Sequence, residues 1–143
     1  MVTVFDVKAN ELIEKVKEEL KKVDAIKPME WAKYVKTSAG RKKPPEQEDW
    51  WYIKAASILR QLYIQKRPVG TQRLRTKYGS TKKRGTVTPH FVKAGGAIIR
   101  KILQQLEKAG FVKKTEIKGK KGRVLTPKGK SFLDKEAAKI KRG

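Results

Sequence analysis

The stretch IIRKILQQLEKAGFVKKTEIKGKKGRVLTPKG, residues 98–129, decides the fold. Isoleucine and leucine recur at helical spacing in its first part, which predicts an amphipathic helix that Gly110 ends. Thr126 and Pro127 supply a cap and a first helical position farther on. Between the two helices, strand-like segments on either side of a Lys/Gly-rich turn are typical of a hairpin. The predicted elements are a helix at 96–109, strands at 111–117 and 123–125 around a turn at 118–122, and a last helix to about Ile140.

Upstream of this stretch, the pattern predicts two further helices. Residues 50–65 carry a stripe of alanine, leucine and tyrosine, and Asp49 can cap the helix they form. A short helix follows at 71–78. The segment STKKRGTVTPHFV, 80–92, is interpreted as an irregular basic loop. Helix, short helix, helix, basic hairpin and helix is the order of a winged-helix fold, whose common use is nucleic-acid binding.

The N-terminal third differs from this core. Residues 9–23 predict an amphipathic helix, Pro28 predicts the start of a short one with Trp31 on its buried side, and the polar segment 37–48 indicates a loop. We therefore expect one mainly α domain over 1–143. It comprises a helical N-terminal part with its loop, 1–48, and a winged-helix-like basic core with a small β-hairpin wing, 49–143.

The charge identifies the kind of partner. The chain has 37 Lys and Arg against 14 Asp and Glu, a net charge of +23 at pH 7. Self-repulsion on this scale opposes compactness unless a polyanion neutralises it. A Lys-rich surface that only keeps the protein soluble is the alternative, but such a surface mixes positive and negative charges. The sequence has no cysteine, which excludes disulfides and thiolate sites and fits a reducing, cytoplasmic location. It has no apolar run near the roughly 18 residues of a membrane span.

The positive charge is concentrated in one part of the chain. Residues 1–49 hold 11 basic and 10 acidic residues, so the remaining +22 belongs to residues 50–143. Thirteen Lys and Arg, and no carboxylate, stand between Asp49 and Glu107. This distribution is that of a binding face for nucleic acid.

Three patterns that resemble catalytic or binding motifs have simpler explanations. Gly129-Lys130-Ser131 resembles the end of a phosphate-binding loop, but Val124 stands where the motif needs its first glycine. The run 119–122 matches the GXXG pattern of another RNA-binding fold, where it joins helices rather than strands. His90, the single histidine, has no second histidine or cysteine with which to hold a metal. We therefore expect no enzyme activity, metal or cofactor.

Aromatic residues could stack on bases, although at helical spacing they are more often core. Tyr52 and Tyr63 share a stripe with alanine and leucine and are assigned to the core. Trp50 and Trp51 are adjacent, so they cannot both face inward, and one of them is free to lie at a surface.

The candidate nucleic-acid contacts are the basic residues that lie off the apolar stripes. Arginine suits bidentate phosphate contacts, and lysine suits point-charge contacts. A solvated charge is the alternative for each of them singly. The candidates are Lys54, Arg60, Arg73, Arg75, Lys77, Lys82, Lys83, Arg84, Arg100, Lys101, Lys120, Lys121 and Arg123.

The segment DWWYIKAASILRQLY, 49–63, resembles the signature helix of the archaeal and eukaryotic small-subunit ribosomal protein family nineteen-e. The likeness continues through Pro68-Val69-Gly70, Pro89-His90-Phe91 and the stretches 98–112 and 122–129. FDVKANELI and PMEWAKYVK also fit, so the resemblance covers nearly the whole chain, and the archaeal branch is the expected one.

The resemblance implies a winged-helix-like fold, assembly into the head of the small subunit against ribosomal RNA beside other ribosomal proteins, and a part in subunit maturation. It implies binding roles for Lys54, Arg60, Arg100, Lys101 and the 82–84 segment. Family members often have arginine at the position of Lys54. The competing hypothesis is a winged-helix DNA-binding transcriptional regulator, which needs paired half-sites and base-reading side chains. Charge spread over helices, loop and wing favours broad phosphate contact by a protein that is monomeric when free.

Overall fold

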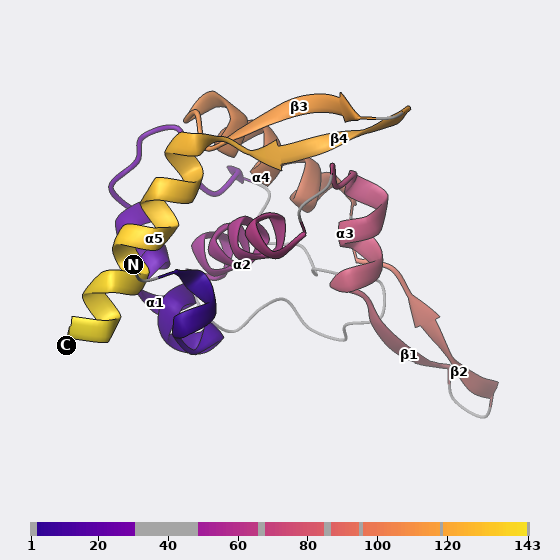
Figure 1. The fold of residues 1–143 in the computed structure, drawn as a ribbon. Coiled ribbons are helices and arrows are strands. Elements are labelled where there is room, and N and C mark those ends of the chain that lie inside the picture. Colours follow the sequence, from indigo (N-terminus) through magenta and orange to yellow (C-terminus); the bar gives the residue numbers. More distant parts are fainter. Residues whose placement is uncertain are drawn as a thin grey trace.

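The computed structural model describes residues 3–30, 49–65, 68–84, 87–94, 96–117 and 119–142. A central helix, α2, contacts α1, α4, α5 and strand β4 (Figure 1). The elements in chain order are a 3-10 turn Val4–Asp6, α1 Ala9–Leu20, α2 Trp50–Ile64, α3 Thr71–Lys77, β1 Ser80–Arg84, β2 Val87–Val92, α4 Gly96–Lys108, β3 Val112–Ile117, β4 Lys120–Leu125 and α5 Pro127–Arg142.

The winged-helix expectation is confirmed. Helices α2, α3 and α4 are followed by the antiparallel wing β3–β4 and then by α5. An isolated antiparallel β-bridge joins the segment between α2 and α3 to the wing, because Val69 and Arg123 exchange two backbone hydrogen bonds of 3.0 Å. The mainly α fold therefore carries a wing that is tied to the helical core at Val69.

The prediction of an irregular loop at 80–92 is wrong. Strands β1 and β2 form a second antiparallel hairpin, with Ser80 opposite Val92 and Thr81 opposite Phe91. Basic residues and Pro89 gave the segment the character of a loop. Both strands of a two-stranded ribbon are edge strands, however, and proline is tolerated at an edge. The hairpin replaces the short turn that usually joins the second and third helices of this fold.

The predicted turn at 118–122 is too long. Pairing continues until Ile117 lies opposite Lys120, and Gly119 between them has φ +80°. Gly122 is a strand residue, and a Cβ atom on it would lie 2.7 Å from the backbone nitrogen of Val69. This glycine therefore permits the close approach of the wing to the Val69 segment.

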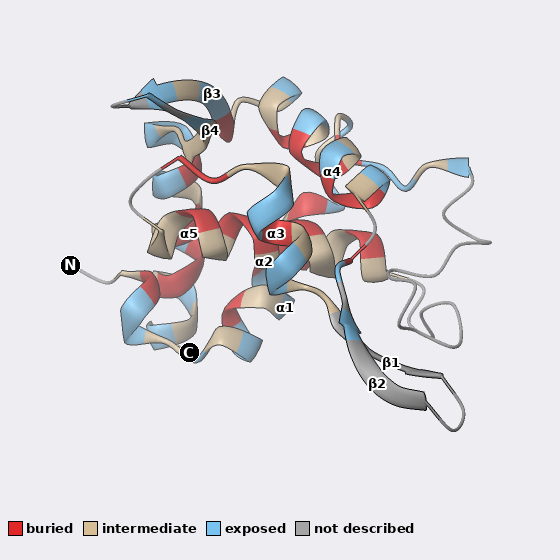
Figure 2. Ribbon diagram, turned by 90° about the vertical axis from the view of Figure 1, so that its right-hand side faces the viewer, coloured by how far each residue is buried: buried red, intermediate tan, exposed pale blue. Residues whose placement is uncertain are grey.

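The hydrophobic core lies around α2 (Figure 2). Trp51 is 1% exposed, whereas its neighbour Trp50 is half-buried and meets it edge to face. The indole N–H of Trp51 donates to Gln105 Oε1 at 2.9 Å, and Gln105 Nε2 donates to the carbonyl of Lys27 at 2.7 Å. This chain of hydrogen bonds joins α2, α4 and the segment after α1. The fully buried large side chains are Val4, Leu12, Leu20, Ile26, Trp51, Ile58, Leu59, Ile99, Ile102, Leu103, Leu106 and Leu133.

Both tyrosines that were assigned to the core pack against it while remaining partly exposed. The Tyr63 hydroxyl donates to Asp134 of α5 at 2.8 Å. Trp31 and the predicted short helix after Pro28 lie largely outside the described residues, as does the loop that follows.

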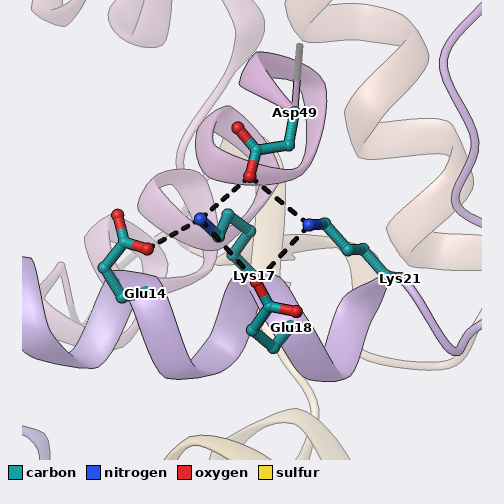
Figure 3. A network of polar contacts seen from close by, with 5 residues as sticks. All are labelled: Glu14, Lys17, Glu18, Lys21 and Asp49. Carbon is teal, nitrogen blue, oxygen red and sulfur yellow. Dashed lines mark hydrogen bonds and ion pairs between the residues drawn. The ribbon is translucent and has the colours of Figure 1, made fainter. Parts of the chain in front are cut away.

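An ion network fastens α1 to the start of α2 (Figure 3). Lys17, 8% exposed, lies 2.7 Å from a Glu14 carboxylate oxygen and 2.8 Å from Asp49 Oδ2. Asp49 is the N-cap residue of α2, but its carboxylate bonds to Lys17 and Lys21 instead of capping the helix. Hydrogen bonding to Lys17 lowers the pKa of Asp49, and the bonds to Asp49 and Glu14 raise the pKa of Lys17.

Replacing Lys17 by methionine should lower the melting temperature near neutral pH. The methionine keeps the apolar stem but leaves Asp49 without its nearest partner. Because the pKa of Asp49 is depressed in the folded state, its contribution to stability is present above the unfolded value of about 3.9 and is lost as the pH falls through the folded value. The difference between Lys17→Met and wild type should therefore shrink toward pH 2 in thermal unfolding followed by circular dichroism.

Lys22→Met is the matched control, since Lys22 is 74% exposed and pairs only with Glu19, at 3.3 Å, in the described part of the chain. An exposed pair of this kind contributes little. Equal melting temperatures for the two variants at pH 7 would contradict a stabilising role for the network.

Candidate nucleic-acid interface

Two predicted contact residues on α2, Lys54 and Arg60, lie near Tyr78, the C-cap residue of α3. Lys54 Nζ lies 5.2 Å from the centre of the Tyr78 ring, and the tyrosine hydroxyl is 2.6 Å from the hydroxyl of Ser57. Burial raises the pKa of Tyr78, opposed by the Ser57 hydrogen bond and the nearby charge of Arg60. Lys54 and Arg60 are half-buried rather than fully exposed. Within the described structure, Arg60 Nε is enclosed without a hydrogen-bond partner, so part of this side chain belongs to the packing.

Two more predicted residues meet above the first turn of α4. Arg75 Nε donates to the carbonyl of Ala94 at 2.8 Å, and the Ala94 amide donates back to the Arg75 carbonyl at 2.8 Å. A Cβ atom on Gly96 would lie 3.3 Å from Arg75 Cδ and 3.7 Å from Arg100 Nη2. Gly96 therefore leaves room for the side chains of Arg75 and Arg100 where α4 begins. Arg75 both positions the end of the β1–β2 hairpin and contributes charge.

The outer sides of α3 and α4 present the remaining helical candidates. Arg73, Lys77 and Arg100 are exposed, and Lys101 is partly exposed. Helix α3 lies between the two hairpins, which project on the same side of the molecule (Figure 1). The elements that carry these cations, α3 and α4, are thus flanked by two projecting hairpins (Figure 1).

The wing carries cations on one face. Lys114 lies opposite Arg123 and Glu116 opposite Lys121 in the β3–β4 register, and these four residues line a hollow of about 440 Å³. Lys121 is exposed, and Arg123 is half-buried with its Nε enclosed and without a hydrogen-bond partner among the described residues. Lys114 was not among the predicted contact residues, although the β3–β4 register places it opposite Arg123.

The backbone of Lys82, Lys83 and Arg84 lies in β1, but the side chains of these residues, like that of Lys120, fall outside the described part of the structure. On the opposite strand Phe91 is 56% exposed. Phe91 was not a predicted contact residue, because the segment 80–92 was interpreted as an irregular loop without strand alternation.

Ion pairs are unevenly distributed over the described residues. The carboxylates of Glu14, Glu18, Glu19 and Asp49 bind lysines in α1 or just after it, namely Lys17, Lys21 and Lys22. Glu136 binds Lys139 within α5. No ion pair in the described structure involves Arg73, Arg100, Lys101 or Lys121. Their charge is therefore available to an external anion.

The described residues contain no group of three His, Cys, Asp or Glu side chains that could hold a metal ion. None of the helices described is long and apolar enough to span a bilayer. The fold and the unpaired cations together define a basic winged-helix protein.

Comparison with known proteins narrows this class. The family model for ribosomal protein S19e matches residues 3–143. The chain is 47% identical over 141 residues to small ribosomal subunit protein eS19 of Aeropyrum pernix, covering 98% of this chain and 90% of that protein. The protein of the same name from Haloarcula marismortui is 44% identical, and the alignment covers 98% of this chain and 92% of that protein. The one from Emericella nidulans is 43% identical, and the alignment covers 95% of this chain and 90% of that protein. The chain belongs to the ribosomal protein S19e family, a family of ribosomal proteins rather than enzymes.

Proposed function

We propose that this protein is a structural constituent of the small ribosomal subunit that binds ribosomal RNA in the subunit head. The contact surface comprises α3, the outer side of α4 and the two hairpins. The observation that carries the proposal is the set of exposed cations on α3, α4 and the β3–β4 wing that lack carboxylate partners in the described structure. Phosphate groups supply the missing negative charge, and many dispersed contacts suit the wide surface of a folded RNA.

Neutralisation of the protein's positive charge by RNA phosphates also suits a role of this protein in subunit assembly. A cationic surface of this size repels itself until phosphate binds, so the protein adds most stability to RNA that is already folded to match it. We propose that it enters the subunit as a monomer, contacts neighbouring ribosomal proteins there and favours maturation of the small subunit. The family relationship to small ribosomal subunit proteins supports this role.

The β1–β2 hairpin distinguishes this proposal from a DNA-binding regulator. A DNA-reading helix-turn-helix joins its second and third helices by a turn of about 3–4 residues. Here α3 ends at Lys77 and α4 begins at Gly96, with a complete hairpin between them. This insertion broadens the surface beside α4 and is unsuited to a close fit in one DNA groove.

The test compares the affinity of the purified protein for small-subunit RNA and for mixed-sequence duplex DNA at several salt concentrations. We expect specific RNA binding to persist at 0.15 M salt, while binding to DNA weakens to the non-specific range of about 10⁻⁴ to 10⁻⁶ M. Equal affinity for both, or a preference for DNA, would overturn the proposal. Co-sedimentation of the native protein with small subunits at the same salt is the corresponding measurement in cell extracts.

A further inference from the structure

A pocket of about 330 Å³ lies between the C-terminal part of α2 and helix α3. Its floor is apolar, because Val69 and Leu74 line it and are 4% and 2% exposed. Polar side chains rise around this floor: Gln61 and Gln65 from the end of α2, and Arg73 and Lys77 from successive turns of α3. The pocket therefore combines an apolar base, two carboxamides and two cations.

Among the described polar residues around the pocket, Thr76 donates its hydroxyl to the Gln72 carbonyl at 3.2 Å, and the other four are unpaired. Within the described part of the chain, the side chains of Gln61, Gln65, Arg73 and Lys77 make no hydrogen bond or ion pair. Gln105, by contrast, uses both ends of its amide in the core. Four side chains with free donors and acceptors thus line one concave site.

The floor of the pocket is held in place before any ligand arrives. Val69 is fixed to the wing by its two backbone hydrogen bonds with Arg123. Leu74 is anchored within α3, since its carbonyl accepts from the Tyr78 amide at 3.0 Å. A preformed cavity with an apolar base and a few polar groups is the usual form of a small-ligand site.

We propose that this pocket receives one unpaired nucleotide of the bound RNA, an inference that rests on the proposed function. The base lies on Val69 and Leu74, the amides of Gln61 and Gln65 bond to its polar edge, and Arg73 and Lys77 hold the adjoining phosphates. Single-stranded loops offer splayed bases to proteins in this way, whereas paired bases within a helix are inaccessible. A volume near the lower end of the roughly 300–1,000 Å³ range of ligand sites matches one nucleotide. The positive rim selects an anionic ligand.

The test separates the contribution of the bases from that of the phosphates. Fluorescence anisotropy would measure binding of ten-nucleotide oligouridylate and oligoadenylate, and of an abasic ribose-phosphate chain with the same number of phosphates, at one salt concentration. We expect wild-type protein to prefer at least one base-bearing chain by about tenfold. The double variant Gln61→Ala/Gln65→Ala should lose this preference while keeping its affinity for the abasic chain, because no charge is changed.

Gln72→Ala is the matched control, since Gln72 is an exposed glutamine of α3, the helix that carries Arg73 and Lys77, and does not line the pocket. Thermal unfolding establishes that each variant is folded. In NMR spectra, uridine or adenosine monophosphate should shift the side-chain amide signals of Gln61 and Gln65 and leave that of Gln72 in place.

Each outcome bears on a different claim. The nucleotide-binding role of the pocket would be overturned if the double variant kept the base preference, or if wild type bound abasic and base-bearing chains equally. Either result would leave the proposed function intact. Failure of wild type to bind any RNA would overturn the proposed function and the pocket with it. Loss of the preference in the double variant, with Gln72→Ala unchanged, supports the assignment.

Discussion

Replacing Arg100, Lys101 and Lys121 together by alanine should weaken binding to small-subunit RNA by roughly 100-fold at 0.15 M salt. Arg100 and Lys121 are exposed, Lys101 is partly exposed, and none of the three forms an ion pair in the described structure. Their removal therefore costs phosphate contacts without exposing core. Each lost contact reduces the slope of log affinity against log salt by about 0.7–0.9, so the slope should fall by about 2–3.

The control for this experiment removes the same charge from another face. Lys8, Lys15 and Lys135 are exposed residues at the start of α1, within α1 and within α5. Their replacement by alanine also lowers the net charge by three, but it should change the slope by less than one. If both triple variants lost affinity equally, binding would depend on net charge alone, and the surface assigned to α4 and the wing would be wrong.

Local periodicity was sufficient to predict most of the helical core. The isoleucines and leucines of α4 recur every three or four residues, and Ile98, Ile99 and Leu103 are indeed buried. The α5 cap was also predicted, since Thr126 Oγ1 accepts from the Gly129 amide at 3.1 Å. Each of these features depends on residues close in sequence, which is why sequence patterns reveal them.

Features that depend on distant contacts were missed. Asp49 had the sequence position of a helix cap, but its carboxylate is taken by Lys17, a residue of another helix. Gly122 resembled a turn residue because nothing local indicates that Val69 lies against it. The β1–β2 hairpin was hidden because its basic residues resemble a loop, and strand pairing is set by the partner strand as well as by propensity.

In the candidate site, too, the features set by local sequence were predicted and those set by distant contacts were not. Charge patterning correctly located exposed cations on α3, α4 and the wing. It did not show that Arg75 is bound to Ala94, or that Arg60 is partly enclosed. The pocket between α2 and α3 was also not predicted, because its glutamines come from α2 and its cations from α3, and local sequence patterns do not show how two helices pack.

Gly129→Ala should destabilise the protein by about 3 kcal/mol, at the upper end of the usual cost of overpacking a core. Gly129 is buried in the first turn of α5, and a Cβ atom there would lie 2.4 Å from the carbonyl oxygen of Phe111. That carbonyl accepts the Thr126 amide at 2.9 Å, and the Thr126 hydroxyl donates to the Gly110 carbonyl at 2.6 Å. Relieving the clash must therefore move the start of α5 away from the end of α4.

Thermal unfolding of Gly129→Ala should show a melting temperature lower by roughly 10 °C, at about 2–4 °C per kcal/mol for a chain of this size. Gly70→Ala provides the comparison, because a Cβ atom on Gly70 meets nothing within 4 Å and its φ of −90° is open to alanine. Gly70→Ala should change the free energy of unfolding by no more than about 0.5 kcal/mol. The contrast isolates steric contact from the general effect of replacing glycine, since alanine restricts the unfolded chain equally in both variants. A small, equal shift in both would mean that α5 can move away from Phe111 at little cost and that its packing does not fix the position of the wing.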